Sequence, residues 1–183
     1  SLDLATGTSE MHDPSAGEKW KVHLLETGYE TMTGGRIKRA SQFLGNRRFM
    51  ATYGDGVSNV NFHDLIAFHD KSGNAGTITG VRPPARFGGL ALDGDQIRHF
   101  EEKPQVGEGW INGGFMVLEP SIVDVIDGDS TILERAPLEA LAESGKLGCF
   151  RHEGFWQCMD TVRDLSLLRE LWESGKAPWK KWI

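Results

Sequence analysis

Apolar and polar positions recur along this chain with two different periods, and each period predicts one kind of element. A spacing of three to four residues is typical of helices and predicts them over 34–44, 61–73, 120–126, 137–143 and 161–173. Short apolar or β-branched runs bounded by turn residues predict strands over 20–26, 47–53, 75–81, 115–118 and 146–151. Two more runs, 90–92 and 96–100, flank Asp93-Gly94-Asp95 and predict a hairpin.

The order of these elements predicts the fold class. Strands and helices alternate in the first half, and the hairpin interrupts them in the middle. This order is typical of an α/β fold, here a mostly parallel, Rossmann-like sheet with an inserted antiparallel hairpin region. Residues 1–19 are polar and show little periodicity, so we expect an irregular segment there and a domain over 20–183.

The closing helix carries its own start signal. Thr161 and Asp164 have the T-x-x-D spacing of a capping box, which would allow the preceding Asp160 another role, although Asp160 could itself be the cap. The apolar spacing along this helix predicts five inward-facing residues: Val162, Leu165, Leu168, Leu171 and Trp172.

Composition narrows the class of partner. The chain has 183 residues, 39% of them hydrophobic, and a net charge of −6, which argues against bulk binding to nucleic acid or to an anionic membrane. An anionic small substrate is still possible, since a local Lys/Arg cluster can hold one. Cys149 and Cys158 lack the spacing of a metal site and predict reduced structural thiols in a cytoplasmic protein.

A lone carboxylate between two glycines, in Gly54-Asp55-Gly56, ends one predicted strand. Asp-Gly is a common turn dipeptide, so Asp55 could simply close a turn. However, a predicted helix follows it, and ligands of open α/β sheets bind at the carboxyl ends of strands. The flanking glycines would let a bulky anion approach the backbone. A turn and a metal or phosphate site are equally good interpretations of this stretch.

Three later stretches carry possible chemistry. FEEKP (100–104) is either an exposed turn or a Lys103 ammonium held by carboxylates to grip a phosphate. NGG (112–114) is either a bulge or a place where a ligand lies on bare backbone, with the Asn112 amide offering a donor and an acceptor to hydroxyls. GFWQCMDT (154–161) contains Asp160, which is either the cap of the closing helix or a residue with another role.

Taken in this order, the stretches resemble the sugar-1-phosphate nucleotidyltransferases. The similarity extends from about residue 21 onward and rests on TMTGGRIKR (31–39), TYGDGV (52–57), PPARFGGL (83–90), FEEKP (100–104), INGGFMVL (111–118), GFWQCMDT (154–161) and GKAPWKKW (175–182). TGGR, GFWQ-x-MDT and the APWK tail are most similar to the members that transfer a cytidylyl group from CTP to glucose 1-phosphate, giving CDP-glucose and pyrophosphate. The product would feed deoxysugar synthesis.

The resemblance assigns roles to single residues. It implies that Asp55 and Asp160 bind Mg²⁺, whose preferred ligands are carboxylate, phosphate and water oxygens. It implies nucleotide contacts from Thr31, Gly34, Gly35, Arg36 and Gly54. It implies that Lys103, supported by Glu102, grips the sugar phosphate, and that Asn112 and Gly113 contact the hexose. The reaction it implies is an in-line attack on the α-phosphorus of CTP, in which Asp55 and Lys103 act by positioning and charge neutralisation.

The resemblance also implies what accompanies the site. The family forms oligomers, so we expect a homo-oligomer in which Trp172, Trp179 and Trp182 lie at an interface, unless they fold back on the closing helix. The family's phosphate-cradling loop, G-G-x-G-T-R, does not occur in these 183 residues. We therefore expect the chain to correspond to the later two-thirds of such an enzyme, without its first βα unit, and to turn over CTP poorly by itself.

Rival interpretations stay open. One is transfer of a different nucleotide, such as thymidylyl or uridylyl, or use of a different sugar. A second is a non-catalytic sugar-phosphate binding or assembly module, which the absence of the phosphate loop favours. A third is a metal-dependent glycosyltransferase, although Gly54-Asp55-Gly56 is not the D-x-D that those enzymes usually carry.

Overall fold

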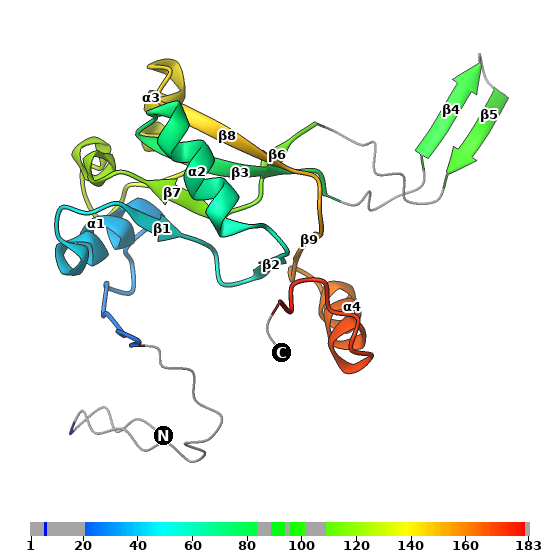
Figure 1. Ribbon diagram of the computed structural model, residues 1–183, viewed down its shortest axis with the longest axis horizontal. Coiled ribbons are helices and arrows are strands. Elements are labelled where there is room, and N and C mark those ends of the chain that lie inside the picture. Colours follow the sequence, from blue (N-terminus) through cyan, green and yellow to red (C-terminus); the bar gives the residue numbers. More distant parts are fainter. Residues whose placement is uncertain (1–5, 7–20, 84–88, 94–95, 102–108, 182–183) are drawn as a thin grey trace.

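The computed structural model describes residues 6, 21–83, 89–93, 96–101 and 109–181, and a five-stranded sheet lies at its centre (Figure 1). Its strands, in chain order, are β1 (Phe49–Ala51), β3 (Gly76–Val81), β6 (Ile111–Asn112), β7 (Met116–Leu118) and β8 (Leu147–His152). The helices are α1 (Thr33–Leu44), α2 (Phe62–Ser72), the 3₁₀ helix η1 (Pro120–Val125), α3 (Ala136–Glu143) and α4 (Val162–Glu173). Two pairs of strands stand outside the central sheet: β2 (Gly56–Ser58) with β9 (Trp156–Cys158), and β4 (Gly89–Asp93) with β5 (Gln96–Glu101).

The α/β class is confirmed, and the pairing within the sheet is mixed. β8 pairs with β3 in parallel, whereas β7 is antiparallel to both β1 and β3, and β6 is antiparallel to β3. β1, β3 and β8 therefore run in one direction, with the interrupted strand β6/β7 reversed between β1 and β3. The chain leaves the sheet at the carboxyl end of β3, forms the β4–β5 hairpin and returns at the same end, so the returning strand has to run backwards.

This reversal corrects the expectation of a mostly parallel sheet, because only one of the four pairings in the described sheet is parallel. The inserted antiparallel hairpin is confirmed as β4 and β5, which project away from the sheet (Figure 1). The strand predicted over 20–26 is wrong where the structure describes it, since 21–26 form no regular element. Weak alternation in a stretch with mostly exposed side chains provides no apolar face to bury.

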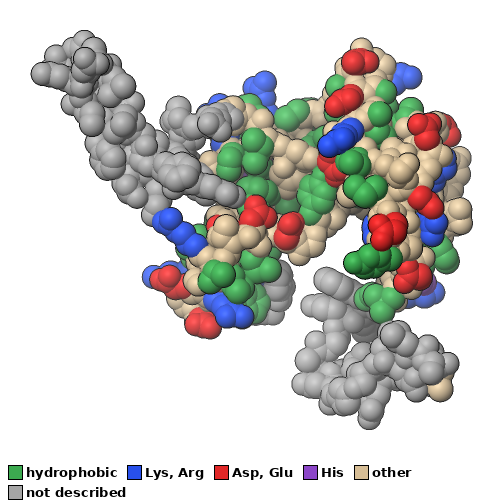
Figure 2. Space-filling model, turned by 180° about the vertical axis from the view of Figure 1, so that it is seen from behind, with side chains coloured by type: hydrophobic (Ala, Val, Ile, Leu, Met, Phe, Trp, Pro, Cys, Tyr) green, Lys and Arg blue, Asp and Glu red, His purple; other side chains and the backbone are tan. Residues whose placement is uncertain are grey.

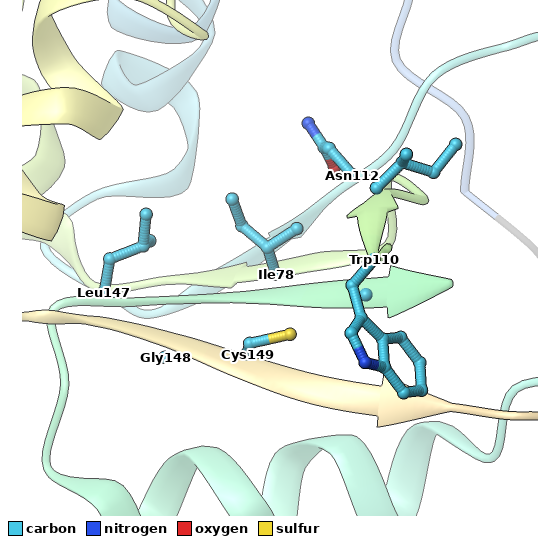
Figure 3. Close-up of a pocket in the computed structure, with 8 residues that line it drawn as sticks. Ile78, Trp110, Asn112, Leu147, Gly148 and Cys149 are labelled. Atoms are coloured by element: carbon cyan, nitrogen blue, oxygen red, sulfur yellow. The ribbon is translucent and has the colours of Figure 1, made fainter. Parts of the chain in front are cut away.

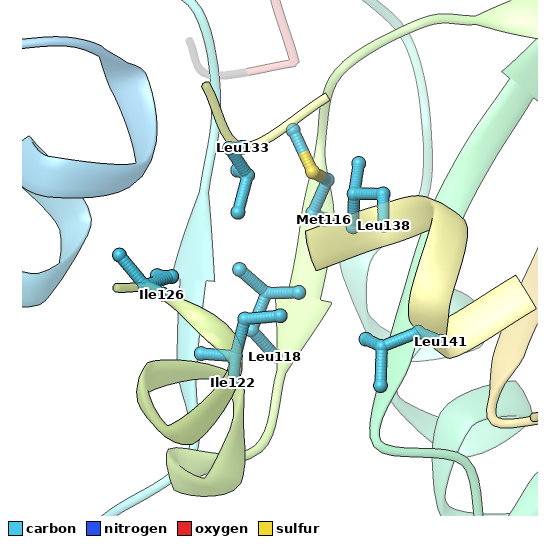
Figure 4. Close-up of a cluster of buried hydrophobic side chains, with 7 residues drawn as sticks. All are labelled: Met116, Leu118, Ile122, Ile126, Leu133, Leu138 and Leu141. Atoms are coloured by element: carbon cyan, nitrogen blue, oxygen red, sulfur yellow. The ribbon is translucent and has the colours of Figure 1, made fainter. Parts of the chain in front are cut away.

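The two faces of β3 explain where the core lies. Thr77 faces α2, where its hydroxyl contacts His69, while Ile78 packs on the opposite face against the main hydrophobic cluster. That cluster joins β7, η1 and α3 and is drawn in Figure 4: Met116, Leu118, Ile122, Ile126, Leu133, Leu138 and Leu141. Seen from behind, hydrophobic side chains gather across the middle of the molecule (Figure 2). This core therefore holds the sheet in place, and the carboxyl ends of β1, β3 and β8 can carry a binding site.

Polar side chains tie the other, amino end of the sheet together. The buried His69 places Nδ1 2.7 Å from the Thr77 hydroxyl and Nε2 3.2 Å from Glu119 Oε1. Arg48 donates to the same Glu119 oxygen at 2.6 Å and also pairs with Asp70. Burial works to raise the pKa of Glu119, but the hydrogen bonds from Arg48 and His69 outweigh it and lower that pKa. We call these five residues (Arg48, His69, Asp70, Thr77 and Glu119) the amino-end network.

Local capping chemistry explains the ends of two helices. Asn61 accepts a hydrogen bond from the His63 amide and begins α2, and Gly73, in the left-handed conformation, ends it. Thr161 and Asp164 form the predicted capping box of α4. The apolar face predicted for α4 is only partly confirmed. Leu165, Leu168 and Leu171 are half-buried.

Val162 and Trp172 of α4 were expected to face inward, and this is wrong: they are 80% and 50% exposed. The helix lies in a separate lobe below the sheet (Figures 1 and 2), and none of its residues is fully buried. The helical spacing identified its apolar positions correctly but could not say whether the chain itself covers them. None of the helices in the described ranges is long and apolar enough to cross a membrane.

Candidate active site

The predicted metal ligands come together through two short strands that the sequence pattern does not reveal. β2 pairs with β9 in antiparallel register, Gly56 opposite Cys158, and the Met159 amide donates to the Asp55 carbonyl at 2.8 Å. Asp55 and Asp160 therefore leave the same end of this two-stranded ladder, although 105 residues of sequence separate their positions (160 minus 55). Asp160 does not cap α4, because the cap is Thr161.

The Asp160 carboxylate also affects its neighbour Cys158. The Cys158 thiol donates to Asp160 Oδ2 at 3.3 Å. Burial, and then this hydrogen bond, raise the pKa of the thiol, which keeps it protonated. Cys149 and Cys158 are both free thiols, as expected. No group of three His, Cys, Asp or Glu side chains able to hold a metal occurs within the part of the chain that is described.

The glycine pair of the TGGR segment packs against a neighbouring loop. A Cβ on Gly34 would lie 2.8 Å from the Thr131 carbonyl oxygen, and one on Gly35 would lie 2.7 Å from the Asp129 Cα. The backbone amides of both glycines also donate to the Thr131 carbonyl. Close packing of α1 on this loop accounts for both glycines, and their predicted contact with the nucleotide stays a prediction.

Arg36 and Thr31 form a second part of the same segment. The Arg36 guanidinium donates to the Thr27 hydroxyl at 2.6 Å and to the Tyr29 carbonyl at 3.1 Å, which holds it over the turn before α1. Thr31 is buried beneath this turn. Arg36 is exposed and forms no salt bridge with a carboxylate of the described residues. It is therefore a cation available to a phosphate group.

Gly54 differs from Gly113 and Gly114 in the space around it. A Cβ added there would meet nothing within 4 Å, so internal packing within the described structure does not require a glycine. The approach of a ligand to the backbone at Gly54 stays a prediction. Gly113, in contrast, has no room: a Cβ would lie 2.6 Å from Val81 Cγ1 and 3.0 Å from the Thr79 carbonyl oxygen.

Asn112 and Gly113 lie where the reversed strand bends between β6 and β7. The Gly113 amide donates to the Thr79 carbonyl, and the Trp156 indole donates to the Gly113 carbonyl at 2.8 Å. The second bond fastens this bend to β9, the strand that leads to Asp160. Phe115 completes the bend with φ of +41°, a conformation that side chains other than glycine rarely adopt. The predicted sugar contacts and one predicted metal ligand are thus held on one connected frame.

A cavity of about 230 Å³ opens beside this bend (Figure 3). Its walls are largely apolar, and Asn112 lies at one end of it as a polar group (Figure 3). The lining residues are Ile78, Gly80, Trp110, Ile111, Asn112, Leu147, Gly148 and Cys149. The guanidinium carbons of Arg82 and Arg151 lie 4.8 and 5.8 Å from the centroid of the Trp110 ring, so two cations flank one wall. The predicted phosphate grip, Lys103 with Glu102, lies outside the described residues.

Tyr53 and Glu134 are the polar residues of this site that the sequence pattern misses. The Tyr53 hydroxyl donates to Glu134 Oε1 at 2.7 Å, and the Thr33 hydroxyl donates to Glu134 Oε2 at 2.7 Å. Asn112 Nδ2 donates to the Tyr53 oxygen at 3.1 Å. We call Thr33, Tyr53, Asn112 and Glu134 the carboxyl-end network. No local pattern could have found it, because 81 residues separate the tyrosine from the glutamate.

The charge state of this network follows from its hydrogen bonds. Burial works to raise the pKa of Glu134, but hydrogen bonds from Tyr53 and Thr33 outweigh it and bring the pKa below its ordinary value. Burial and the contact with Glu134 raise the pKa of the Tyr53 phenol well above its ordinary value. At neutral pH the glutamate is therefore an anion that accepts two bonds, and the phenol keeps its proton.

Comparison with known proteins shows which family the chain resembles. Residues 15–166 match the family described as Nucleotidyl transferase. A glucose-1-phosphate cytidylyltransferase of Salmonella typhi is 47% identical over 180 residues, which are 98% of this chain and 70% of the relative. The chain belongs to the nucleotidyl transferase family. A protein of Bacillus subtilis (strain 168) named probable glucose-1-phosphate cytidylyltransferase is 40% identical over 100% of this chain and 72% of its own length.

The solved structures support the fold of this nucleotidyl transferase. HddC from Yersinia pseudotuberculosis superposes with a TM-score of 0.59 over 78% of this chain, at 24% sequence identity. The chain spans 63% of the HddC chain, a little under two thirds. At this level of identity the likeness extends to the fold alone, and the mixed α/β sheet is part of it.

Proposed function

We propose that the protein to which this chain belongs transfers a cytidylyl group from CTP to glucose 1-phosphate, giving CDP-glucose and pyrophosphate. The relatives from S. typhi and B. subtilis that align with nearly all of the chain are named for this activity. The geometric observation that carries the proposal is the β2–β9 pairing, which brings Asp55 and Asp160 to one end of one ladder. Residues that served only as a turn and as a helix cap would have no reason to meet.

The proposed cofactor is Mg²⁺, held by Asp55 and Asp160. These are two carboxylates only, and no group of three His, Cys, Asp or Glu side chains able to hold a metal occurs in the described residues, so the protein would supply an incomplete cage. Such a donor set suits Mg²⁺, which is commonly bound by one or two carboxylates and completed by substrate phosphates and water. When bound, the ion would neutralise the charge of the triphosphate. Calcium sites, which recruit more protein ligands, fit this donor set less well.

The side chains of this chain would then bind and orient the two substrates. We place Arg36 and Thr31 at the nucleotide, Gly54 where the nucleotide passes the backbone, Lys103 at the sugar phosphate, and Asn112 at the hexose. The sugar phosphate oxygen attacks the α-phosphorus of CTP and pyrophosphate leaves, so the protein supplies no nucleophile. Positioning and electrostatic stabilisation would supply the rate enhancement.

The activity assay decides between this function and its rivals. The complete product of the gene that encodes this chain is incubated with Mg²⁺, each nucleoside triphosphate and a panel of hexose 1-phosphates, and pyrophosphate and nucleotide sugars are quantified. We expect turnover to be fastest with CTP and α-glucose 1-phosphate. Faster turnover with another pair reassigns the substrates, and binding of the sugar phosphate without pyrophosphate release supports the non-catalytic module.

We also propose that the enzyme acts in the cytoplasm as a homo-oligomer. CTP and reduced thiols are both available in the cytoplasm, and both cysteines are free. The surface proposed for oligomer contact is the exposed side of α4 that carries Val162 and Trp172. Trp179 does not belong to this surface, since it stacks on Phe155 with ring centroids 5.4 Å apart, and Trp182 lies outside the described residues. A Val162→Glu, Trp172→Glu protein that sediments like the wild type would contradict the α4 interface.

A further inference from the structure

The proton of one tyrosine decides which way a neighbouring amide points. Tyr53 has a single hydroxyl proton, and it lies between two polar neighbours, Glu134 Oε1 at 2.7 Å and Asn112 Nδ2 at 3.1 Å. An ionised carboxylate only accepts hydrogen bonds, so the phenol must donate to Glu134. The phenol oxygen can then only accept from Asn112, which requires the nitrogen of the amide, rather than its oxygen, to face the tyrosine.

The other end of the Asn112 amide is fixed in the same way. Its Oδ1 accepts the Gly114 amide proton at 2.9 Å. Rotating the amide by 180° would place Oδ1 against a phenol oxygen that has no proton to give, and Nδ2 against an N–H donor. Both contacts would be lost, and each such loss is worth about 0.5–1.5 kcal/mol. One orientation of the amide is therefore selected.

We propose that Tyr53 and Glu134 are positioning residues that fix the Asn112 amide for a hydroxyl of the hexose. This inference rests on the proposed function, in which Asn112 contacts the sugar. An asparagine amide has two N–H donors and an oxygen with two lone pairs. In the described structure Tyr53 takes one donor and Gly114 one lone pair, so Asn112 offers one donor and one acceptor side by side. That pair matches a sugar hydroxyl, which both accepts and donates.

The backbone of the bend supports this arrangement. Gly114 has φ of +76°, and a Cβ there would lie 3.1 Å from the Tyr53 ring, so a glycine lets the ring lie against bare backbone. The Thr79 hydroxyl donates to the Phe115 carbonyl at 2.8 Å and holds the next residue of the bend. The tyrosine is thus located by packing before its hydrogen bonds locate the amide.

Glu134 connects the amide to the start of α1. Thr33, the first residue of α1, donates to Glu134 Oε2 and accepts the Leu133 amide proton at 2.9 Å. The segment that precedes and begins α1 carries the predicted nucleotide contacts Thr31 and Arg36. One carboxylate therefore links the nucleotide segment to the sugar contact. In Glu134→Gln one of the two carboxylate oxygens becomes an amide nitrogen, which cannot accept from the hydroxyl that faces it.

The test uses Tyr53→Phe and Glu134→Gln in the complete enzyme, with glucose 1-phosphate and its monodeoxy analogues as substrates. Tyr29→Phe is the matched control, because it is the chain's other tyrosine and is 92% exposed. The exposed Glu143→Gln controls for the glutamate. We expect both network variants to raise KM for glucose 1-phosphate about tenfold, with a change in kcat below about threefold. The controls keep wild-type kinetics.

The analogues separate positioning from general damage. For the analogue that lacks the hydroxyl held by Asn112, the wild-type enzyme already loses about tenfold in kcat/KM, and Tyr53→Phe should lose nothing further. The penalty should persist on every other analogue. An equal penalty on all analogues, or a wild-type KM for Tyr53→Phe, would overturn the proposal.

A second measurement keeps this proposal separable from the function itself. In NMR spectra, the Asn112 Nδ2 protons, assigned by their loss in Asn112→Asp, should exchange with solvent faster in Tyr53→Phe than in the wild type. Identical exchange refutes the amide orientation whether or not the enzyme turns over. If the wild type makes no CDP-glucose although Tyr53→Phe accelerates exchange, the proposed function fails and the network geometry stands. If Tyr53→Phe does not fold, Glu134→Gln is tested by the same kinetic and NMR exchange measurements.

Discussion

The two ends of the sheet each carry a polar network, and the two are built differently. In the amino-end network both nitrogens of the buried His69 are engaged, and Glu119 accepts from Arg48 as well as from His69. In the carboxyl-end network Asn112 keeps one donor and one acceptor unused among the described residues. The buried centre of the first network has no polar atom left for a ligand, whereas the second network ends in a side chain with hydrogen-bonding capacity to spare.

This difference separates stability from recognition. A buried side chain such as His69, whose polar atoms are all engaged, stabilises the fold but has nothing left for a ligand. A network that ends in a partly engaged amide stabilises less and can bind. The carboxyl end also holds the open space at Gly54 and the Asp55–Asp160 ladder, whereas His69 and Thr77 at the amino end are almost completely buried. Substitutions at the two ends should therefore fail in different assays.

The largest effect is expected at Asp55, in turnover alone. Asp55→Asn keeps the shape of the side chain but removes a hard anionic ligand, so Mg²⁺-dependent turnover should fall by about a hundredfold or more. The melting temperature should not change, because Asp55 is exposed. Steady-state kinetics over a Mg²⁺ titration measure the loss, and the exposed Asp127→Asn is the matched control. Undiminished activity in Asp55→Asn would remove this residue from the proposed metal site.

Matched threonines give the next largest effect and test the comparison directly. Thr77→Val leaves Nδ1 of the buried His69 without a partner and should lower the free energy of unfolding by about 1–3 kcal/mol, with KM unchanged. Thr33→Val at the exposed start of α1 should cost less than about 1 kcal/mol but raise KM for CTP, since Thr33 links Glu134 to the nucleotide segment. Urea unfolding and steady-state kinetics are run on both proteins. The comparison fails if both variants lose stability and affinity in equal proportion.

Substitutions of two glycines at the carboxyl end of the sheet should likewise affect either stability or substrate binding. Gly113→Ala places a Cβ 2.6 Å from Val81 Cγ1 and should lower stability by about 1–3 kcal/mol through overpacking. Gly54→Ala meets no protein atom within 4 Å and should leave stability within about 0.5 kcal/mol, but raise KM for CTP where the nucleotide needs that space. Thermal unfolding and CTP titrations distinguish them. An unchanged KM in Gly54→Ala would mean that no ligand approaches this backbone.

Features set by neighbouring residues were predictable from the sequence. The caps of α2 and α4 depend on side chains within a few residues of the helix end, so Asn61, Gly73 and Thr161 with Asp164 could be identified directly. The hairpin of β4 and β5 is likewise local. The candidate site residues came from motif order, and the pairing of β2 with β9 gives Asp55 and Asp160 a common location.

Features that depend on distant partners were not predictable. β2 and β9 have three residues each, too few for a period to show, and they form because each supplies the other's hydrogen bonds. The Tyr53–Glu134 contact has no local pattern at all. Val162 shows the reverse case. The spacing correctly assigns it to the apolar face of α4, but the sequence does not show whether another element covers that face. The period of apolar residues in a sequence predicts which face of an element is apolar, but only the fold shows which residues pack against that face.

The smallest effect, and the one shared by both ends, is acid sensitivity. The pKa values of Glu119 and Glu134 both lie below the ordinary value of 4.5, because hydrogen bonds to each carboxylate outweigh the effect of burial. The unfolded chain then binds more protons than the folded one, so the stability that these groups contribute is present above about pH 4.5 and is lost as the pH falls through the folded-state pKa. Glu119→Gln and Glu134→Gln cannot take up that proton, and each should reduce the fall in melting temperature between about pH 5 and about pH 3. Because the two networks share no residue, the reductions should add in the double variant, with Glu143→Gln unchanged from the wild type. A double variant as acid-sensitive as the wild type would show that neither carboxylate is stabilised in the folded state by the bonds described.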